Sequence, residues 1–219
     1  MGEFASRWRL LFKGGRIPLW IKLLYTAFMA VLIPYYWKQY TPVNFLWFCD
    51  VALLCTLAAL WLENRLLASM QAITITIPDG LWIADFFGRL IVGRKVLIGQ
   101  TDYMFDPENP LFVRGLSFFH IWLPVLLLWM VWRLGYDRRA LVAQTVLAWI
   151  VLLLSYALTD GPTGRPGNVN KVWGPGESET QTWMAAPAWL ALVMLAYPVC
   201  IFLPTHLVLC WVFRRAKAA

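Results

Sequence analysis

Charged residues are scarce in this sequence, at 14% of its 219 positions, whereas soluble domains carry about a quarter. Hydrophobic residues make up 60% of the chain and include 14 tryptophans. This balance excludes an ordinary soluble domain and indicates a membrane protein.

Cysteine is absent from the segments that would form loops. The four cysteines, Cys49, Cys55, Cys200 and Cys210, all fall inside apolar runs, and no CxxC or Cys/His spacing accompanies them. A disulfide framework of the secreted type and a metal site are therefore not expected. The simplest interpretation of each cysteine is a small buried apolar residue.

The motifs of soluble enzymes and of cofactor proteins are also missing. The sequence has no GxSxG, no glycine-rich phosphate loop, no HExxH and no dinucleotide fingerprint, and its two histidines are not spaced to hold haem or copper. Inverted repeats and filter-like segments, which are typical of transporters and channels, are not visible. We expect no cofactor.

The net charge of +7 does not indicate a nucleic-acid partner, because the basic residues form no continuous stripe. They lie in short clusters between apolar runs, which is the pattern of orientation signals in membrane proteins. The expected partners are therefore membrane lipids, with other membrane-protein subunits as a further class.

Five apolar runs are long enough to cross a bilayer. They occupy residues 17–37, 43–62, 113–133, 140–159 and 183–213. The first follows a basic stretch, as in a signal peptide, but no small-residue cleavage site follows it, so we expect a retained span. The last is longer than a crossing needs, so we expect it to tilt, to bend at Pro198 or Pro204, or to leave the bilayer early.

The segment 64–98 supplies a sixth span, and Pro78, Asp79 and Gly80 form a turn signal in its middle. It is either one kinked span or a short span that ends at Pro78, followed by an amphipathic helix in the membrane interface. Aromatic and aliphatic residues repeat at helical spacing after the turn signal, which favours the second alternative.

The predicted fold is an all-α membrane protein, a six-helix transmembrane bundle with both termini cytoplasmic and an outer-side cap. Most of the 19 Lys and Arg residues then lie inside. The chain divides into a basic cytoplasmic N-terminus at 1–16, one transmembrane domain at 17–213 and a basic cytoplasmic tail at 214–219. Outer loops at about 79–112 and 160–182 are usually functional or disordered at such lengths. Their Trp, Tyr and Phe content indicates partly ordered covers over the outer ends of the helices, and these form the cap.

Few ionisable residues lie inside the predicted spans, and each is costly there and therefore a functional candidate. Cys49 and Asp50 follow the outer end of the second span, and His120 follows the outer end of the span 113–133. Both sites reach roughly 10 Å below the outer interface at about 1.5 Å per residue. A thiol and an imidazole at one depth form a minimal nucleophile and base for attack on a lipid ester.

The same pair also arises by chance in a six-helix bundle, where a buried histidine often only bonds a neighbouring helix. His206, near the inner end of the last span, is expected to be structural. Six further residues are candidates for orienting the reactive groups or for stabilising an oxyanion. They are Asn44, Asp50, Asp85, Arg114, Asn168 and Asn170, with Arg114 as a pairing partner of Asp50.

Several stretches resemble a bacterial integral-membrane family that is related to a eukaryotic transmembrane phospholipid acyltransferase. They are NFLWFCDVALLCTLAAL, SMQAITITIPDG, FFHIWLPVLL and NVNKVWGPG, within about residues 43–175. A fainter resemblance is to the androgen-induced hydrolases of fatty-acid esters. The resemblance implies Cys49 as nucleophile and His120 as its partner, although Trp47 stands where the family has a histidine.

The sequence thus predicts an intramembrane Cys/His lipid acyltransferase or ester hydrolase in the bacterial cytoplasmic (inner) membrane. The alternative is a non-catalytic transmembrane subunit or assembly factor of a larger membrane complex, which the aromatic surface and the short soluble parts also fit. Labelling of Cys49 by a thiol-reactive lipid-ester probe would favour the enzyme.

Overall fold

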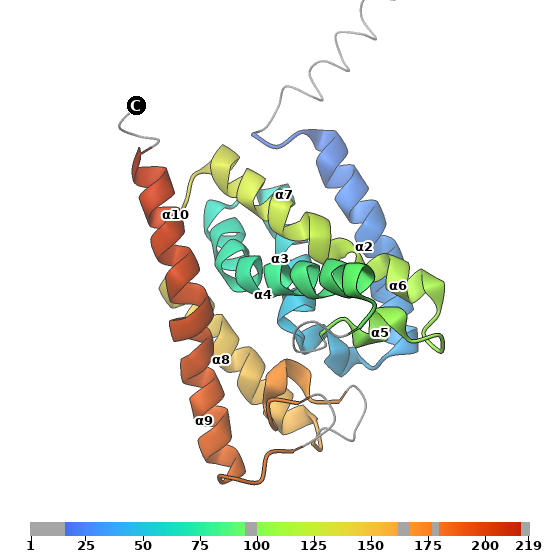
Figure 1. Ribbon diagram of the computed structural model, residues 1–219. Helices are drawn as coiled ribbons and strands as arrows, with labels where there is room; N and C mark the ends of the chain where they lie inside the picture. The colour runs from blue at the N-terminus through green and yellow to red at the C-terminus, as the bar shows by residue number, and fades with distance from the viewer. Residues whose placement is uncertain (1–15, 95–99, 162–166, 177–179, 216–219) are drawn as a thin grey trace, which may run out of the picture.

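A computed structural model describes residues 16–94, 100–161, 167–176 and 180–215, and every regular element in these ranges is a helix (Figure 1). The longer helices are α2 (Leu19–Gln39), α3 (Phe48–Leu62), α4 (Arg65–Val92), α7 (Phe119–Leu134), α8 (Ala140–Leu158), α9 (Ala186–Ala196) and α10 (Leu203–Arg215). The short ones are η1 (Pro42–Leu46), α5 (Asp102–Phe105), α6 (Leu111–Ser117), η2 (Val169–Lys171) and η3 (Tyr197–Phe202). The predicted all-α class is confirmed.

Five helical segments of the described chain are long and apolar enough to cross a membrane. They are α2, α4, α6 with α7, α8, and α9 through α10. They match five of the six expected spans, and several such helices are consistent with an integral membrane protein.

The expected second span, 43–62, forms the shorter helix α3, which follows η1. Its 15 residues extend over roughly 22 Å, less than the approximately 30 Å of a hydrocarbon core. A sixth crossing, and with it the cytoplasmic position of both termini, therefore stays a prediction.

Pro78 does not end a helix, and the alternative favoured by the sequence is wrong on this point. Helix α4 continues through Pro78 for 28 residues to Val92, so the first outer loop begins later than residue 79. Proline inside a helix costs about 3 kcal/mol, because a backbone hydrogen bond is lost and its ring crowds the preceding turn. Ile75 and Trp82 on either side are buried against other elements, and this packing offsets the cost.

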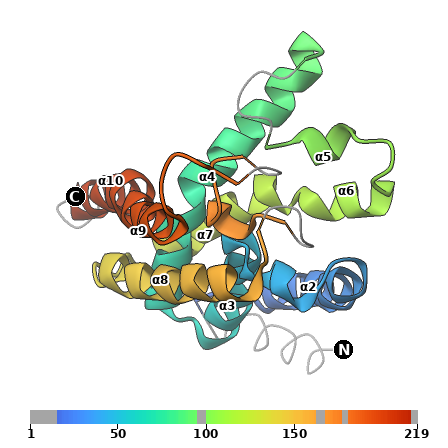
Figure 2. The same cartoon turned by 90° about the horizontal axis from the view of Figure 1, so that it is seen from below.

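The last apolar run is continuous, with one change of winding. A π-helical turn, η3, carries Pro198 between α9 and α10, and the N–H of Leu203 bonds the carbonyl of Pro198. Insertion of a π turn accommodates a proline without ending the helix. Figure 2 views α9 and α10 nearly end-on and α4 lengthwise, so α4 crosses α9 and α10 instead of running parallel to them.

Helix α4 is the centre of the packing, in contact with α3, α7 and α8. Its residues Ala72 and Ile73 are fully buried, together with Leu53 of α3 and Leu127 of α7. The start of α2 and the end of α10 lie toward the top of Figure 1, whereas α5 and η2 lie toward its lower part. Residues 1–15 and 216–219 of the predicted cytoplasmic ends lie outside the described chain.

Candidate functional site

A cavity of about 810 Å³ opens where η1, the start of α3, the middle of α4, the start of α7 and η2 meet. It is lined by both apolar and polar side chains. The residues with polar, ionisable or thiol groups are Tyr36, Tyr40, Asn44, Cys49, Asp50, Thr74, Asp79, Gln100, Tyr103, Asn109, Ser117, His120, Asn168, Asn170, Lys171, Tyr197 and Cys200. The cavity therefore brings together six of the eight residues that the sequence singled out.

Cys49 enters the cavity from the first turn of α3, and a distant side chain holds that turn in place. Asn170, in η2, accepts a hydrogen bond from the Phe48 N–H (3.0 Å) and donates one to the Leu46 carbonyl (2.7 Å). Asn170 has a φ of 52°, in the left-handed region that asparagine tolerates better than most residues. The predicted supporting residue Asn170 thus braces the backbone beside Cys49.

His120 lies in the first turn of α7 with its ring held on two sides. Its Nδ1 is 2.8 Å from the carbonyl oxygen of Ser117, which can only accept a hydrogen bond. Nδ1 therefore carries the proton, and Nε2 is the nitrogen with a free lone pair. The ring also stacks on Trp82 at 4.9 Å and an interplanar angle of 9°, and Trp82 donates a hydrogen bond to the Tyr103 hydroxyl.

Cys49 and His120 both line the cavity. No hydrogen bond joins the thiol and the imidazole in the described part of the chain, although both side chains line the same volume. A reacting atom would thus have to lie between them, which suits a substrate that occupies the cavity before the proton moves.

Two buried carboxyl groups also line the cavity. Asp50 is 3% exposed, and its Oδ2 accepts a hydrogen bond from the Asn44 amide (3.1 Å). Asp79 is 2% exposed. Asp50 Oδ1 and Asp79 Oδ2 have no hydrogen-bond partner among the described residues. Such groups are rare in protein interiors and need an explanation.

Asp79 was missed by the sequence analysis, because the Pro-Asp-Gly stretch indicated a turn. In a turn its carboxylate would be exposed to solvent and unremarkable. With α4 continuous through Pro78, the residue becomes an ionisable group inside a helix that is long and apolar enough to span a membrane. The rule that identified Asp50 would then have identified Asp79.

Asn168 lines the cavity, but its side-chain amide is fully engaged with its own loop. Nδ2 donates to the carbonyls of Gly174 and Gly176, both at 2.8 Å, and Oδ1 accepts from the Trp173 N–H at 2.9 Å. An oxyanion would have to displace these bonds. The amide groups of Asn168 and Asn170 are therefore suited to support the site and poorly suited to bind an oxyanion.

Asp85 and Arg114 do not line the cavity. Asp85 accepts hydrogen bonds from the backbone N–H (3.0 Å) and the hydroxyl (2.7 Å) of Thr101. Arg114 donates to the carbonyls of Asn109 and Met104. The expected pairing of Arg114 with Asp50 is absent from the described structure. Asp85 and Arg114 instead hold the segment around α5 in place.

His206 lies outside this site, as expected. Its Nδ1 is 2.6 Å from the Tyr136 hydroxyl, and its Nε2 is 3.5 Å from the Cys210 sulfur. Both ring nitrogens have partners, and the residue does not line the cavity. Its contacts join α10 to the turn before α8.

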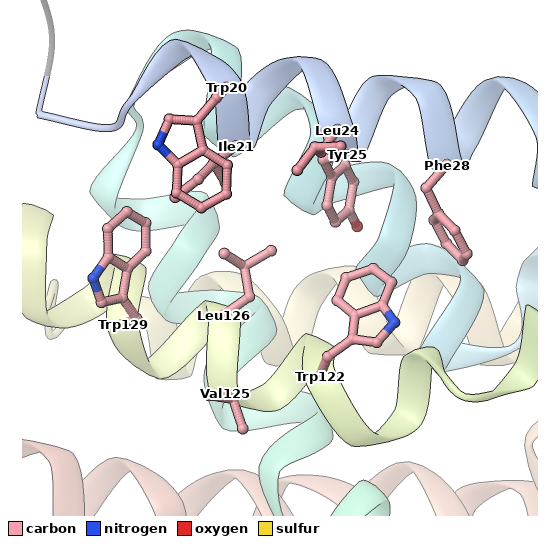
Figure 3. A pocket seen from close by; sticks show the side chains of 9 residues that line it. All are labelled: Trp20, Ile21, Leu24, Tyr25, Phe28, Trp122, Val125, Leu126 and Trp129. Atoms are coloured by element: carbon pink, nitrogen blue, oxygen red, sulfur yellow. The ribbon is translucent and has the colours of Figure 1, made fainter. Parts of the chain in front are cut away.

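A second hollow, of about 540 Å³, lies between α2 and α7 and has a different character (Figure 3). Its walls are aromatic and aliphatic, and Trp122 meets Tyr25 and Phe28 edge to face at 5.8 and 5.0 Å. The Tyr25 hydroxyl is occupied by the Leu53 carbonyl. This apolar groove offers space for hydrocarbon and no reactive group.

Comparisons with models of protein families, with curated proteins and with solved structures find no match to this chain. The family resemblance drawn from its short motifs therefore stays a prediction. Within the described residues, no three His, Cys, Asp or Glu side chains gather to form a metal-ligand set.

Proposed function

We propose that this integral membrane protein is an intramembrane lipid-acyl enzyme, either a transferase or a hydrolase. Cys49 is the nucleophile and His120 is the general base. The observation that carries the proposal is the cavity itself, which gathers a thiol and an imidazole with a free Nε2 from separate helices. Among the described residues, neither the thiol nor Nε2 has a hydrogen bond to another side chain.

The chemistry begins when a lipid ester enters the cavity between the two residues. Nε2 of His120 takes the proton of the Cys49 thiol, and the sulfur attacks the ester carbonyl. The ester C–O bond breaks, the proton passes to the departing alcohol oxygen, and the acyl group is held as a thioester. Water, or the hydroxyl of a second lipid, then attacks the thioester and regenerates the thiol.

The first turn of α3 supplies a place for the negative charge that develops on the carbonyl oxygen. The N–H groups of Cys49 and Asp50 lie in this turn, where a helix has no internal acceptors for them. Backbone donors at a helix start stabilise an oxyanion well. They replace Asn168 and Asn170, whose amides are already bonded, in that role.

The test is turnover of a fluorescent phospholipid ester by the purified protein in lipid nanodiscs. Cys49→Ala and His120→Ala should each lower the rate at least about a hundredfold, because they remove the nucleophile and the base. Cys55→Ala is the matched control, since Cys55 lies on α3 but does not line the cavity. Full activity in both site variants would contradict the mechanism.

The alternative, a non-catalytic subunit of a larger membrane complex, predicts a different result in the same assay. The wild-type protein would show no turnover and no acyl adduct on Cys49 by intact-mass spectrometry. It would instead copurify with defined partner subunits in mild detergent. The proposed enzyme and its location in a bacterial cytoplasmic membrane, with the cavity toward the outer side, would then both need revision.

A further inference from the structure

The cavity has more hydrogen-bond acceptors than its own side chains satisfy. Asp50 Oδ1 and Asp79 Oδ2 come from two different helices, are buried, and have no partner among the described residues. A buried carboxyl group that lacks a donor is destabilising, whether it is charged or neutral. In a membrane protein such groups usually mark the path or the site of a polar ligand.

The neighbouring side chains do not meet this need. The Asn44 amide reaches only the other oxygen of Asp50. The hydroxyls of Tyr36, Tyr40 and Tyr103 also line the cavity, but none of them bonds Asp50 Oδ1 or Asp79 Oδ2. A ligand that brings donors of its own would satisfy these two oxygens.

We propose that the cavity binds a lipid headgroup that donates hydrogen bonds to Asp50 and Asp79, through an ammonium group or through hydroxyls. The inference deepens the proposed function, on which it rests for the ligand being a lipid. A trimethylammonium headgroup has the same positive charge as an ammonium headgroup but no N–H donors. The site should therefore discriminate against it.

The first experiment compares three short-chain phospholipids that differ only in the headgroup: ethanolamine, glycerol and choline. Each is titrated into the full-length protein in detergent, and its Kd is measured by calorimetry. The donor-bearing headgroups should bind about tenfold tighter than choline, the effect of one hydrogen bond to a charged group. Preference for ethanolamine alone would identify the ammonium group, and preference for both would identify donors in general.

The second experiment removes the acceptors one at a time. Asp50→Asn and Asp79→Asn keep the shape of each side chain, and each should reduce the preference over choline to about twofold or less, because an amide accepts more weakly than a carboxylate. Asp160→Asn is the control, because Asp160 is exposed and does not line the cavity. It should leave the preference unchanged.

Equal binding of the three lipids, no binding of any of them, or an unchanged preference in both aspartate variants would overturn the inference. These outcomes are separable from a failure of the proposed function. Cys49→Ala should keep the headgroup preference while it abolishes turnover. A wild-type protein that discriminates among headgroups without turning over any ester would retain the headgroup site and lose the acyl chemistry.

Discussion

Buried carboxyl groups occur at two regions of this molecule, and they differ in their partners. In the turn between α7 and α8, Asp137 is 5% exposed and accepts hydrogen bonds from Arg65 Nε (3.2 Å) and Arg139 Nη2 (2.9 Å). It also accepts one from the backbone N–H of Arg139. In the cavity, Asp50 and Asp79 are equally buried, yet each has an oxygen without a partner among the described residues.

The difference separates stability from binding. At Asp137 the carboxylate is neutralised within the fold, so the group contributes to holding α4 and α8 together. At Asp50 and Asp79 the desolvation cost is only partly offset by the described part of the fold, which agrees with the proposal that a ligand binds there. Burial alone does not distinguish the two regions. They differ in whether each buried carboxyl oxygen has a hydrogen-bond partner.

The two histidines repeat the contrast. His206 bonds Tyr136 through one ring nitrogen and Cys210 through the other, so it links elements. His120, which lines the cavity, uses one nitrogen to fix its ring, and no side chain among the described residues bonds the other. A base must keep a lone pair available, and of the two histidines only His120 meets that condition.

The largest expected effect is a difference in stability between two variants, each of which neutralises one carboxylate in one of the two regions. Asp137→Asn should lower the free energy of unfolding by about 1 kcal/mol, since it removes a charged acceptor from two arginines that are themselves largely exposed. Asp79→Asn should leave the stability unchanged or raise it, because the removed charge has no described partner for Oδ2. Melting temperatures in one detergent measure both. An equal loss in the two variants would remove the distinction between the regions.

Long apolar runs and the rarity of intramembrane ionisable groups made much of the molecule predictable. The all-helical class and four of the five helices that are long and apolar enough to cross a membrane follow from hydrophobic length alone. Cys49 and His120 were found because a thiol and an imidazole at equal depth are conspicuous in such a chain. Both lie in the first turns of their helices, and both line one cavity.

The rest depended on tertiary contacts that a single sequence does not reveal. Pro78 has a strong local signal for a stop, and only the burial of residues around it keeps α4 helical. Because the span was expected to end at Pro78, Asp79 was not recognised as a buried carboxyl group. Asn170 was identified by its residue type, but its role as a brace depends on Phe48, 122 positions away in sequence. Asp85 and Arg114 were candidates because they are charged, but their partners are Thr101 and the carbonyls of Asn109 and Met104, near α5.

Acid should weaken the region around Asp137 in a defined pH window. Hydrogen bonds from the Arg139 guanidinium lower the pKa of the Asp137 carboxyl to about 2, from a usual 3.8. A lowered pKa means that the stabilisation is complete above about pH 4 and is lost as the pH falls through about 2. We expect about 1 kcal/mol, because the two arginines are largely exposed and their pairing is screened. The stability difference between wild type and Asp137→Asn should shrink between about pH 5 and pH 2, and a constant difference would contradict this account.

The smallest effect is expected at Glu63, near the start of α2, where the carboxylate is 22% exposed and pairs with Lys22 at 2.9 Å. Partial burial raises the pKa of this carboxyl, but hydrogen bonds from Lys22 and from the backbone of Arg16 and Ile17 lower it by more, so the pKa is lowered overall. Glu63→Gln should therefore cost less than about 1 kcal/mol, with most of the loss absent in high salt. Melting temperatures at two salt concentrations measure it. A larger loss than that of Asp137→Asn would mean that burial and the number of charged donors do not predict how much each carboxylate contributes to stability. The missing partners of Asp50 and Asp79 would then no longer indicate that these residues bind a ligand.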